Sequence, residues 1–122
     1  MSRRVMIVDD ALFMRNLLKD IFVRAGYQVV GEADSGETAL AIYQQTRPEL
    51  VTMDIVMPEK SGLETVRDIL AADPEACILM ISALGQDMLL AEAIVAGAKD
   101  FIIKPFKEEQ VLDIAKRLLE EA

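Results

Sequence analysis

The chain has 122 residues, 52% of them hydrophobic and 28% charged, and its formal net charge at pH 7 is -8. This length suits a single domain over residues 1–122, and the apolar content excludes a disordered chain. No apolar run approaches the roughly 18 residues of a membrane span, and residues 5–8 are too short a run for a secretory signal, so we expect a cytoplasmic protein that does not enter a membrane. The acidic balance and the lack of a basic run argue against nucleic-acid binding.

Two residue types that dominate enzyme and metal sites are almost missing. The chain has no histidine, which excludes Ser-His-Asp triads, Cys-His pairs and histidine-ligated metals. Its one cysteine, Cys77, forms neither an intrachain disulfide nor a multi-thiolate zinc site. Because an apolar run follows Cys77, we expect a buried strand residue there.

Short apolar runs alternate with helical periodicity along the whole chain. The runs expected as strands are residues 5–8, 28–31, 50–53, 78–81 and 101–103, of which 28–31 is weaker and nearer an edge. Apolar spacing predicts helices over residues 13–22, 36–45, 63–70, 86–96 and 107–121. This alternation predicts an α/β fold, a doubly wound parallel five-stranded sheet with helices on both faces.

Polar side chains follow four of the predicted strands. Asp9 and Asp10 come after the first, Asp54 after the third, Ser82 after the fourth and Lys104 after the fifth. Each alone is commonly a helix cap, a turn residue or a solvated side chain. Since open parallel sheets bind ligands beyond the carboxyl ends of their strands, all five together predict one site at that edge.

The residue types at this edge favour phosphoryl chemistry. Three crowded carboxylates repel one another unless a cation joins them, and oxygen ligands without nitrogen or sulfur suit Mg²⁺. The metal and Lys104 would balance the carboxylate charge and leave a pocket that accepts a phosphoryl group. A carboxylate is already anionic at pH 7 and can attack phosphorus, so the pattern favours an aspartyl phosphate.

These residues resemble the receiver domain of two-component response regulators over essentially the whole chain. The resemblance rests on Asp9-Asp10, on residues 54–58 (DIVMP) with Gly62, on Ser82-Ala83 and on residues 104–106 (KPF). Residues 11–16 and 82–86 look more like the stand-alone CheY-like chemotaxis regulators than like transcriptional regulators. The resemblance implies a (βα)5 flavodoxin-like fold with strand order 2-1-3-4-5.

The resemblance also implies a role for each site residue. Asp54 would be the phosphorylated residue. Asp10 and Asp54 would bind Mg²⁺ directly together with the main-chain carbonyl of Val56, while Asp9 would act mainly through a metal-bound water.

The remaining two site residues would act on the phosphoryl group. Ser82 and Lys104 would contact the phosphoryl oxygens, and the Lys104–Pro105 peptide bond would be cis. The donor would be the phosphohistidine of a chemotaxis histidine kinase.

Two positions suggest a long-lived phosphoryl group. In this family the residues two after the phosphorylated aspartate and two after the fourth-strand hydroxyl flank the path of the hydrolytic water. Here they are Val56 and Leu84, whose aliphatic side chains cannot orient a water molecule. We therefore expect slow autodephosphorylation and a separate phosphatase.

The fourth predicted helix is apolar around nearly its whole circumference. It includes Leu90 and Ile94, follows Leu84 and precedes Phe101, which stands where many receivers have tyrosine or histidine as the switch aromatic. An apolar surface helix beside this residue favours a docking face, formed by the fourth helix, Phe101 and the fifth helix, for the output partner. The resemblance to chemotaxis regulators implies that this partner is the flagellar motor switch protein. Packing of the fourth helix against the fifth, and Phe101 as a plain strand residue, are the alternatives.

We therefore expect a stand-alone response regulator that acts in trans and is an enzyme only on its own phosphoryl group. One alternative is a single-domain phosphorelay intermediate. A haloacid-dehalogenase-type phosphohydrolase would need an aspartate where Val56 stands and a cap domain. A phosphorylation-independent interaction module would not need the acidic pair, Asp54, Ser82 and Lys104.

Overall fold

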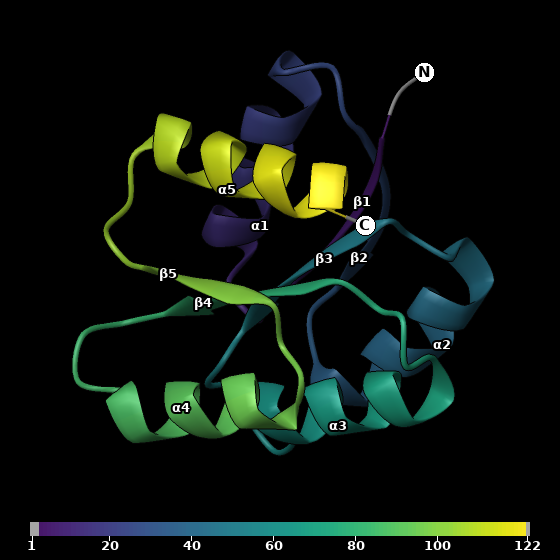
Figure 1. The fold of residues 1–122 in the computed structure, drawn as a ribbon, viewed down its shortest axis with the longest axis vertical. Helices are drawn as coiled ribbons and strands as arrows, with labels where there is room; N and C mark the ends of the chain where they lie inside the picture. Colours follow the sequence, from purple (N-terminus) through teal and green to yellow (C-terminus); the bar gives the residue numbers. More distant parts are fainter. Residues whose placement is uncertain (1–2, 122) are drawn as a thin grey trace.

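A computed structural model describes residues 3–121, with five strands and five helices alternating along the chain (Figure 1). The strands are β1 (Arg4–Val8), β2 (Gln28–Ala33), β3 (Leu50–Asp54), β4 (Ile78–Ser82) and β5 (Asp100–Ile103). The helices are α1 (Leu12–Arg24), α2 (Gly36–Thr46), α3 (Gly62–Ala72), α4 (Asp87–Ala96) and α5 (Glu108–Glu121).

The strands form one parallel sheet in the order β2-β1-β3-β4-β5. This confirms the doubly wound α/β fold and the strand order implied by the resemblance. The strand of weakest apolar pattern, β2, lies at an edge, where it has one neighbour and needs less burial.

Helices cover both faces of the sheet, and each face has its own core. Figure 1 shows α1 and α5 on one side of the strands and α2, α3 and α4 on the other. Successive strand residues point to opposite faces, so in β1 Val5 and Ile7 pack beneath α1 and α5, while Met6 and Val8 pack against the other three helices. All four side chains are buried, which explains the continuous apolar runs of the central strands.

The position of α4 decides between the two explanations of its apolar sequence. It lies beside α3, whereas α5 lies with α1 on the opposite face (Figure 1). The apolar surface of α4 is therefore not used to pack against α5. Leu89, Ile94 and Val95 of this helix remain exposed to solvent.

The expectation of a buried strand residue at Cys77 is wrong. Cys77 is half-buried and directly precedes β4 instead of lying inside it. None of the helices among residues 3–121 is both long enough and apolar enough to cross a membrane.

Candidate functional site

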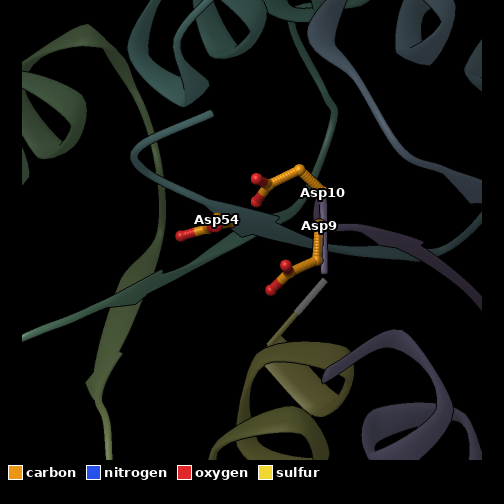
Figure 2. A group of neighbouring side chains, drawn as sticks. All are labelled: Asp9, Asp10 and Asp54. Carbon is orange, nitrogen blue, oxygen red and sulfur yellow. The ribbon is translucent and has the colours of Figure 1, made fainter. Parts of the chain in front are cut away.

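The three aspartates predicted from the sequence lie together at one edge of the sheet. In the β1–β3 register Val8 faces Met53, so the next residues, Asp9 and Asp54, are neighbours at the ends of the two strands. Asp10 follows directly, and Figure 2 shows the three carboxylates gathered in one place. Each offers an oxygen, and these oxygens lie within 4.8 Å of one another.

Lys104 lies between the two buried carboxylates. Its Nζ is 3.7 Å from Asp9 Oδ2 and 3.7 Å from Asp54 Oδ1, which places a positive charge near both without a close hydrogen bond to either. The peptide bond from Lys104 to Pro105 is cis, as expected. We call Asp9, Asp10, Asp54 and Lys104 the acidic pocket.

Asp9 is almost completely buried but only half satisfied by hydrogen bonds. Its Oδ1 accepts from the Ala11 amide at 2.9 Å, and Arg15 Nη1 donates to the Asp9 carbonyl at 2.7 Å. Its Oδ2 is buried without a hydrogen-bond partner. Burial raises the pKa of Asp9 above its usual value, against the Ala11 amide and the Lys104 charge, which lower it.

Asp54 has the more strongly shifted pKa of the two. Burial, reinforced by the nearby charge of Asp9, raises the pKa of Asp54 to about 6, although Lys104 and a hydrogen bond from the Val56 amide oppose the rise. Strongly perturbed carboxyl groups in a cluster are typical of functional sites. At pH 7 the carboxylate is therefore the major form of Asp54.

The acidic pocket has the composition of a site for a hard divalent cation. The candidate ligands are all oxygens, and the formal charge of three carboxylates and one ammonium is negative. The buried Asp9 Oδ2, which lacks a hydrogen-bond donor, offers a further acceptor toward such an ion or its water shell. These features fit Mg²⁺, which prefers one or two carboxylates and retains several waters.

The loop after β3 folds tightly back on Asp54. The Gly62 amide donates to the Ile55 carbonyl at 2.9 Å, and a Cβ at Gly62 would lie 2.1 Å from the carbonyl oxygen of Asp54. Only glycine permits this approach of two backbones. The start of α3 is held there by a capping box, in which Ser61 and Glu64 bond to each other's backbone amides.

Ser82 is fully buried at the end of β4, and its hydroxyl is directed to the turn that follows. Its Oγ lies 3.1 Å from the Ala83 carbonyl oxygen and 3.1 Å from Gln86 Oε1, and its single proton is donated to one of these two acceptors. The Ala83 amide donates to the same Gln86 oxygen at 2.8 Å. The sequence indicates no role for Gln86, because nothing in the spacing shows that its side chain turns back on the strand.

A second predicted region lies between α4 and β5. An apolar groove of about 600 Å³ is lined by Leu84, Asp87, Leu90, Ile94, Phe101 and Ile103, among others, and we call it the α4–β5 groove. Leu84 is 80% exposed, Phe101 42% and Ile94 39%. The structure thus places all four of the predicted face residues in one groove.

Leu90 differs from the other members of this face. It is 7% exposed and belongs to the core beneath α4, so it forms the floor of the groove instead of its rim. A lysine at this position would bury a charge and disturb the fold. Exposed residues such as Ile94 are the correct places to test docking.

Comparisons with known proteins agree with this architecture. A family model described as the response regulator receiver domain matches residues 5–116. The chemotaxis protein CheY of Thermotoga maritima is 49% identical over 118 residues, covering 97% of this chain and 98% of that protein. CheY of Bacillus subtilis is 48% identical over 119 residues, covering 98% and 99%.

A solved structure is similar in the same way. A chain of the crystal structure of the CheX-CheY-BeF3-Mg²⁺ complex from Borrelia burgdorferi matches with a TM-score of 0.90 and 35% identity. The match covers 95% of this chain and 88% of that one. The similarity therefore spans both the acidic pocket and the α4–β5 groove.

Proposed function

Because the chain belongs to the response regulator receiver domain family and is CheY-like over nearly its whole length, we propose that it is a chemotaxis phospho-switch. Its phosphoryl acceptor is Asp54. The observation that carries this proposal is the acidic pocket itself, in which two buried carboxylates, a third exposed one and the Lys104 ammonium meet.

The reaction is a direct transfer to a carboxylate. One oxygen of ionised Asp54 attacks the phosphorus of a phosphohistidine on a chemotaxis histidine kinase. A P–O bond forms, the P–N bond breaks and the leaving imidazole takes a proton from water. Lys104 lies 3.7 Å from Asp54 Oδ1 and stabilises the negative charge on the transferred oxygens, while Ser82 donates to one of them.

Mg²⁺ is the proposed cofactor: Asp10, Asp54 and the Val56 carbonyl would hold it, and Asp9 would act through a water bound to it. When bound, it supplies positive charge that brings the formal balance of three carboxylates, one ammonium and one divalent ion to neutrality.

The phosphoryl group is expected to be long-lived. Hydrolysis requires a water to attack phosphorus, breaking the bond to Asp54 and releasing phosphate. The two side chains proposed to flank its path, Val56 and Leu84, are exposed aliphatic groups that cannot hydrogen-bond to it. We therefore propose that a separate phosphatase ends the signal and that the chain catalyses only its own phosphoryl chemistry.

The output surface is the α4–β5 groove with Phe101 as the switch aromatic. The phenyl ring has no hydroxyl, so any partner contact at this residue is apolar. We propose the flagellar motor switch protein as the partner and the cytoplasm as the location. A phosphorelay intermediate is the alternative, and it predicts transfer from Asp54 to a second histidine protein instead of binding to the motor.

Intact-mass spectrometry after incubation with acetyl phosphate tests the acceptor. We expect one phosphoryl adduct that requires Mg²⁺ and disappears in Asp54→Asn. If wild-type protein forms no adduct with acetyl phosphate or with a purified chemotaxis kinase, the phospho-switch is wrong. An adduct that persists in Asp54→Asn would move the acceptor to another residue.

A further inference from the structure

Gln86 occupies the N-cap position of α4, but its side chain does not cap the helix. It turns back toward β4 instead, where Oε1 accepts from Ser82 Oγ at 3.1 Å and from the Ala83 amide at 2.8 Å. The backbone amides in the first turn of α4 donate no hydrogen bond to this side chain. A role in helix stability therefore does not explain its position.

The orientation of the Gln86 amide follows from its partners. The Ala83 amide can only donate, so the Gln86 atom facing it must be the oxygen. The same oxygen faces the Ser82 hydroxyl, which must then donate its single proton either to Gln86 or to the Ala83 carbonyl. Both acceptors lie in the β4–α4 turn and hold the Ser82 hydroxyl in that turn.

We propose that Gln86 is a latch that holds Ser82 in the unphosphorylated arrangement and that a phosphoryl oxygen on Asp54 must displace it. The proposal rests on the proposed function, in which Ser82 donates to that oxygen. A hydroxyl has one proton, so Ser82 cannot serve Gln86 and the phosphoryl group together. Gln86 is a positioning residue that acts through Ser82, not a group that touches the reacting atoms.

The latch also connects the acidic pocket to the α4–β5 groove. The bonds from Gln86 to Ser82 and Ala83 close a short turn that contains Leu84 and Gly85, whose φ is +90°. Leu84 lines the groove, and the next residue after the latch, Asp87, begins α4 and also lines it. Release of Ser82 therefore removes one of the two bonds that close this turn at one end of the groove.

Binding of beryllofluoride, an analogue of the phosphoryl group, measures the latch without any catalytic step. Isothermal titration calorimetry with Mg²⁺ and fluoride in excess would give its affinity for wild type, Gln86→Leu and Gln86→Glu. Loss of a neutral hydrogen bond in Gln86→Leu should tighten binding about three- to tenfold, because Ser82 then has only the Ala83 carbonyl to leave and not the Gln86 oxygen as well. Gln86→Glu keeps acceptor oxygens and should show no tightening.

A double-mutant cycle with Ser82→Ala distinguishes a latch from a general effect on the β4–α4 turn. If Gln86 acts through the Ser82 hydroxyl, the Leu substitution should no longer tighten binding in the Ser82→Ala background. An equal tightening in both backgrounds, or none in either, would overturn the latch.

The outcomes separate the latch from the function beneath it. If wild type binds beryllofluoride, Ser82→Ala weakens binding and Gln86→Leu leaves it unchanged, then the latch alone is wrong. If wild type does not bind beryllofluoride, or Ser82→Ala binds as wild type does, then the proposed role of the acidic pocket or of Ser82 fails and the latch fails with it.

Discussion

The acidic pocket and the α4–β5 groove are unfavourable in opposite ways: the pocket buries charged groups, and the groove exposes apolar ones. The pocket buries charge, with a carboxylate oxygen of Asp9 lacking a hydrogen-bond partner and the Asp54 pKa raised by burial. The groove leaves apolar side chains such as Leu84 and Ile94 in water. Each arrangement lowers the stability of the free protein, and each is relieved by a different kind of ligand: a cation and a phosphoryl group in one case, an apolar partner surface in the other.

This contrast shows why the two regions can communicate. A small ligand with dense charge changes the hydrogen bonds of the pocket but cannot cover an apolar surface. The segment from Ser82 to Asp87 belongs to both regions, because it begins beside the pocket and ends in the groove. Changes in a few hydrogen bonds of the acidic pocket can therefore change the shape of the α4–β5 groove.

Loss of the one positively charged side chain proposed to act on the phosphoryl group should have the largest effect. Lys104→Met should slow phosphorylation by acetyl phosphate by about 10²- to 10³-fold, as expected for removal of one preorganised donor. The rate can be followed by intact-mass spectrometry. Lys107→Met, which removes an exposed lysine three residues on, is the matched control and should react at the wild-type rate. Equal rates for the two variants would exclude Lys104 from the chemistry.

Gly62→Ala should distort the loop after β3 that packs against the backbone of Asp54. Its Cβ would lie 2.1 Å from the Asp54 carbonyl oxygen, so the backbone must move, and we expect a loss of about 3 kcal/mol or more in the free energy of unfolding by urea. Gly26→Ala is the control, since φ is +93° there and no atom lies within 4 Å. Strain alone should cost it about 1 kcal/mol. A smaller loss for Gly62→Ala than for Gly26→Ala would contradict the tight packing.

The raised pKa of Asp54 predicts how stability depends on pH in metal-free protein. A pKa of about 6 in the fold against 3.8 for the free side chain means that the folded state binds more protons between these values. Stability should therefore rise as pH falls from 7 toward 4, and the buried Asp9, whose pKa is also raised, acts in the same direction.

Two changes should remove this dependence. Asp54→Asn should raise the free energy of unfolding at pH 7 by up to about 3 kcal/mol and flatten its pH profile. Mg²⁺ should raise the melting temperature of wild type at pH 7 more than at pH 5, where protons compete for the carboxylates. A wild-type profile that falls on acidification over this range would show that Asp54 is not destabilised by burial.

A charge in the groove should have the smallest effect on the fold and should act only on the partner. Ile94→Lys should weaken binding of a phosphorylation-dependent partner at least about tenfold while changing unfolding free energy by less than about 0.5 kcal/mol. Val23→Lys introduces the same charge at an exposed apolar residue of α1, on the other face of the sheet, and should bind normally. Loss of phosphorylation in Ile94→Lys would mean that the groove is not a separate output surface.

The positions of the strands and helices could be predicted from the sequence. Strands buried on both faces have continuous apolar runs, whereas helices buried along one side have apolar residues at a spacing of three to four. The same reasoning placed Asp9, Asp54 and Lys104 at one edge, since parallel strands share the direction of their carboxyl ends. The strand order came from the resemblance to a family, because periodicity alone does not say which strands are neighbours.

Burial of individual α4 residues could not be predicted in this way. The helix is apolar on nearly all sides, so its sequence does not distinguish Leu90, which is part of the core, from Ile94 on the surface. Only the packing of α4 beside α3 and over the sheet selects the inward face.

By itself, the sequence determined which chemical groups are available at the strand ends: carboxylates, a hydroxyl and an ammonium, with no histidine to compete with them. Only the tertiary structure decided how they are balanced. The pKa of Asp54 depends on burial and on the charge of Asp9, and the direction of the Ser82 hydroxyl depends on a glutamine side chain that turns back from α4. Electrostatic and hydrogen-bond energies vary with the distances between groups and with their exposure to solvent, and the fold alone sets those distances and exposures.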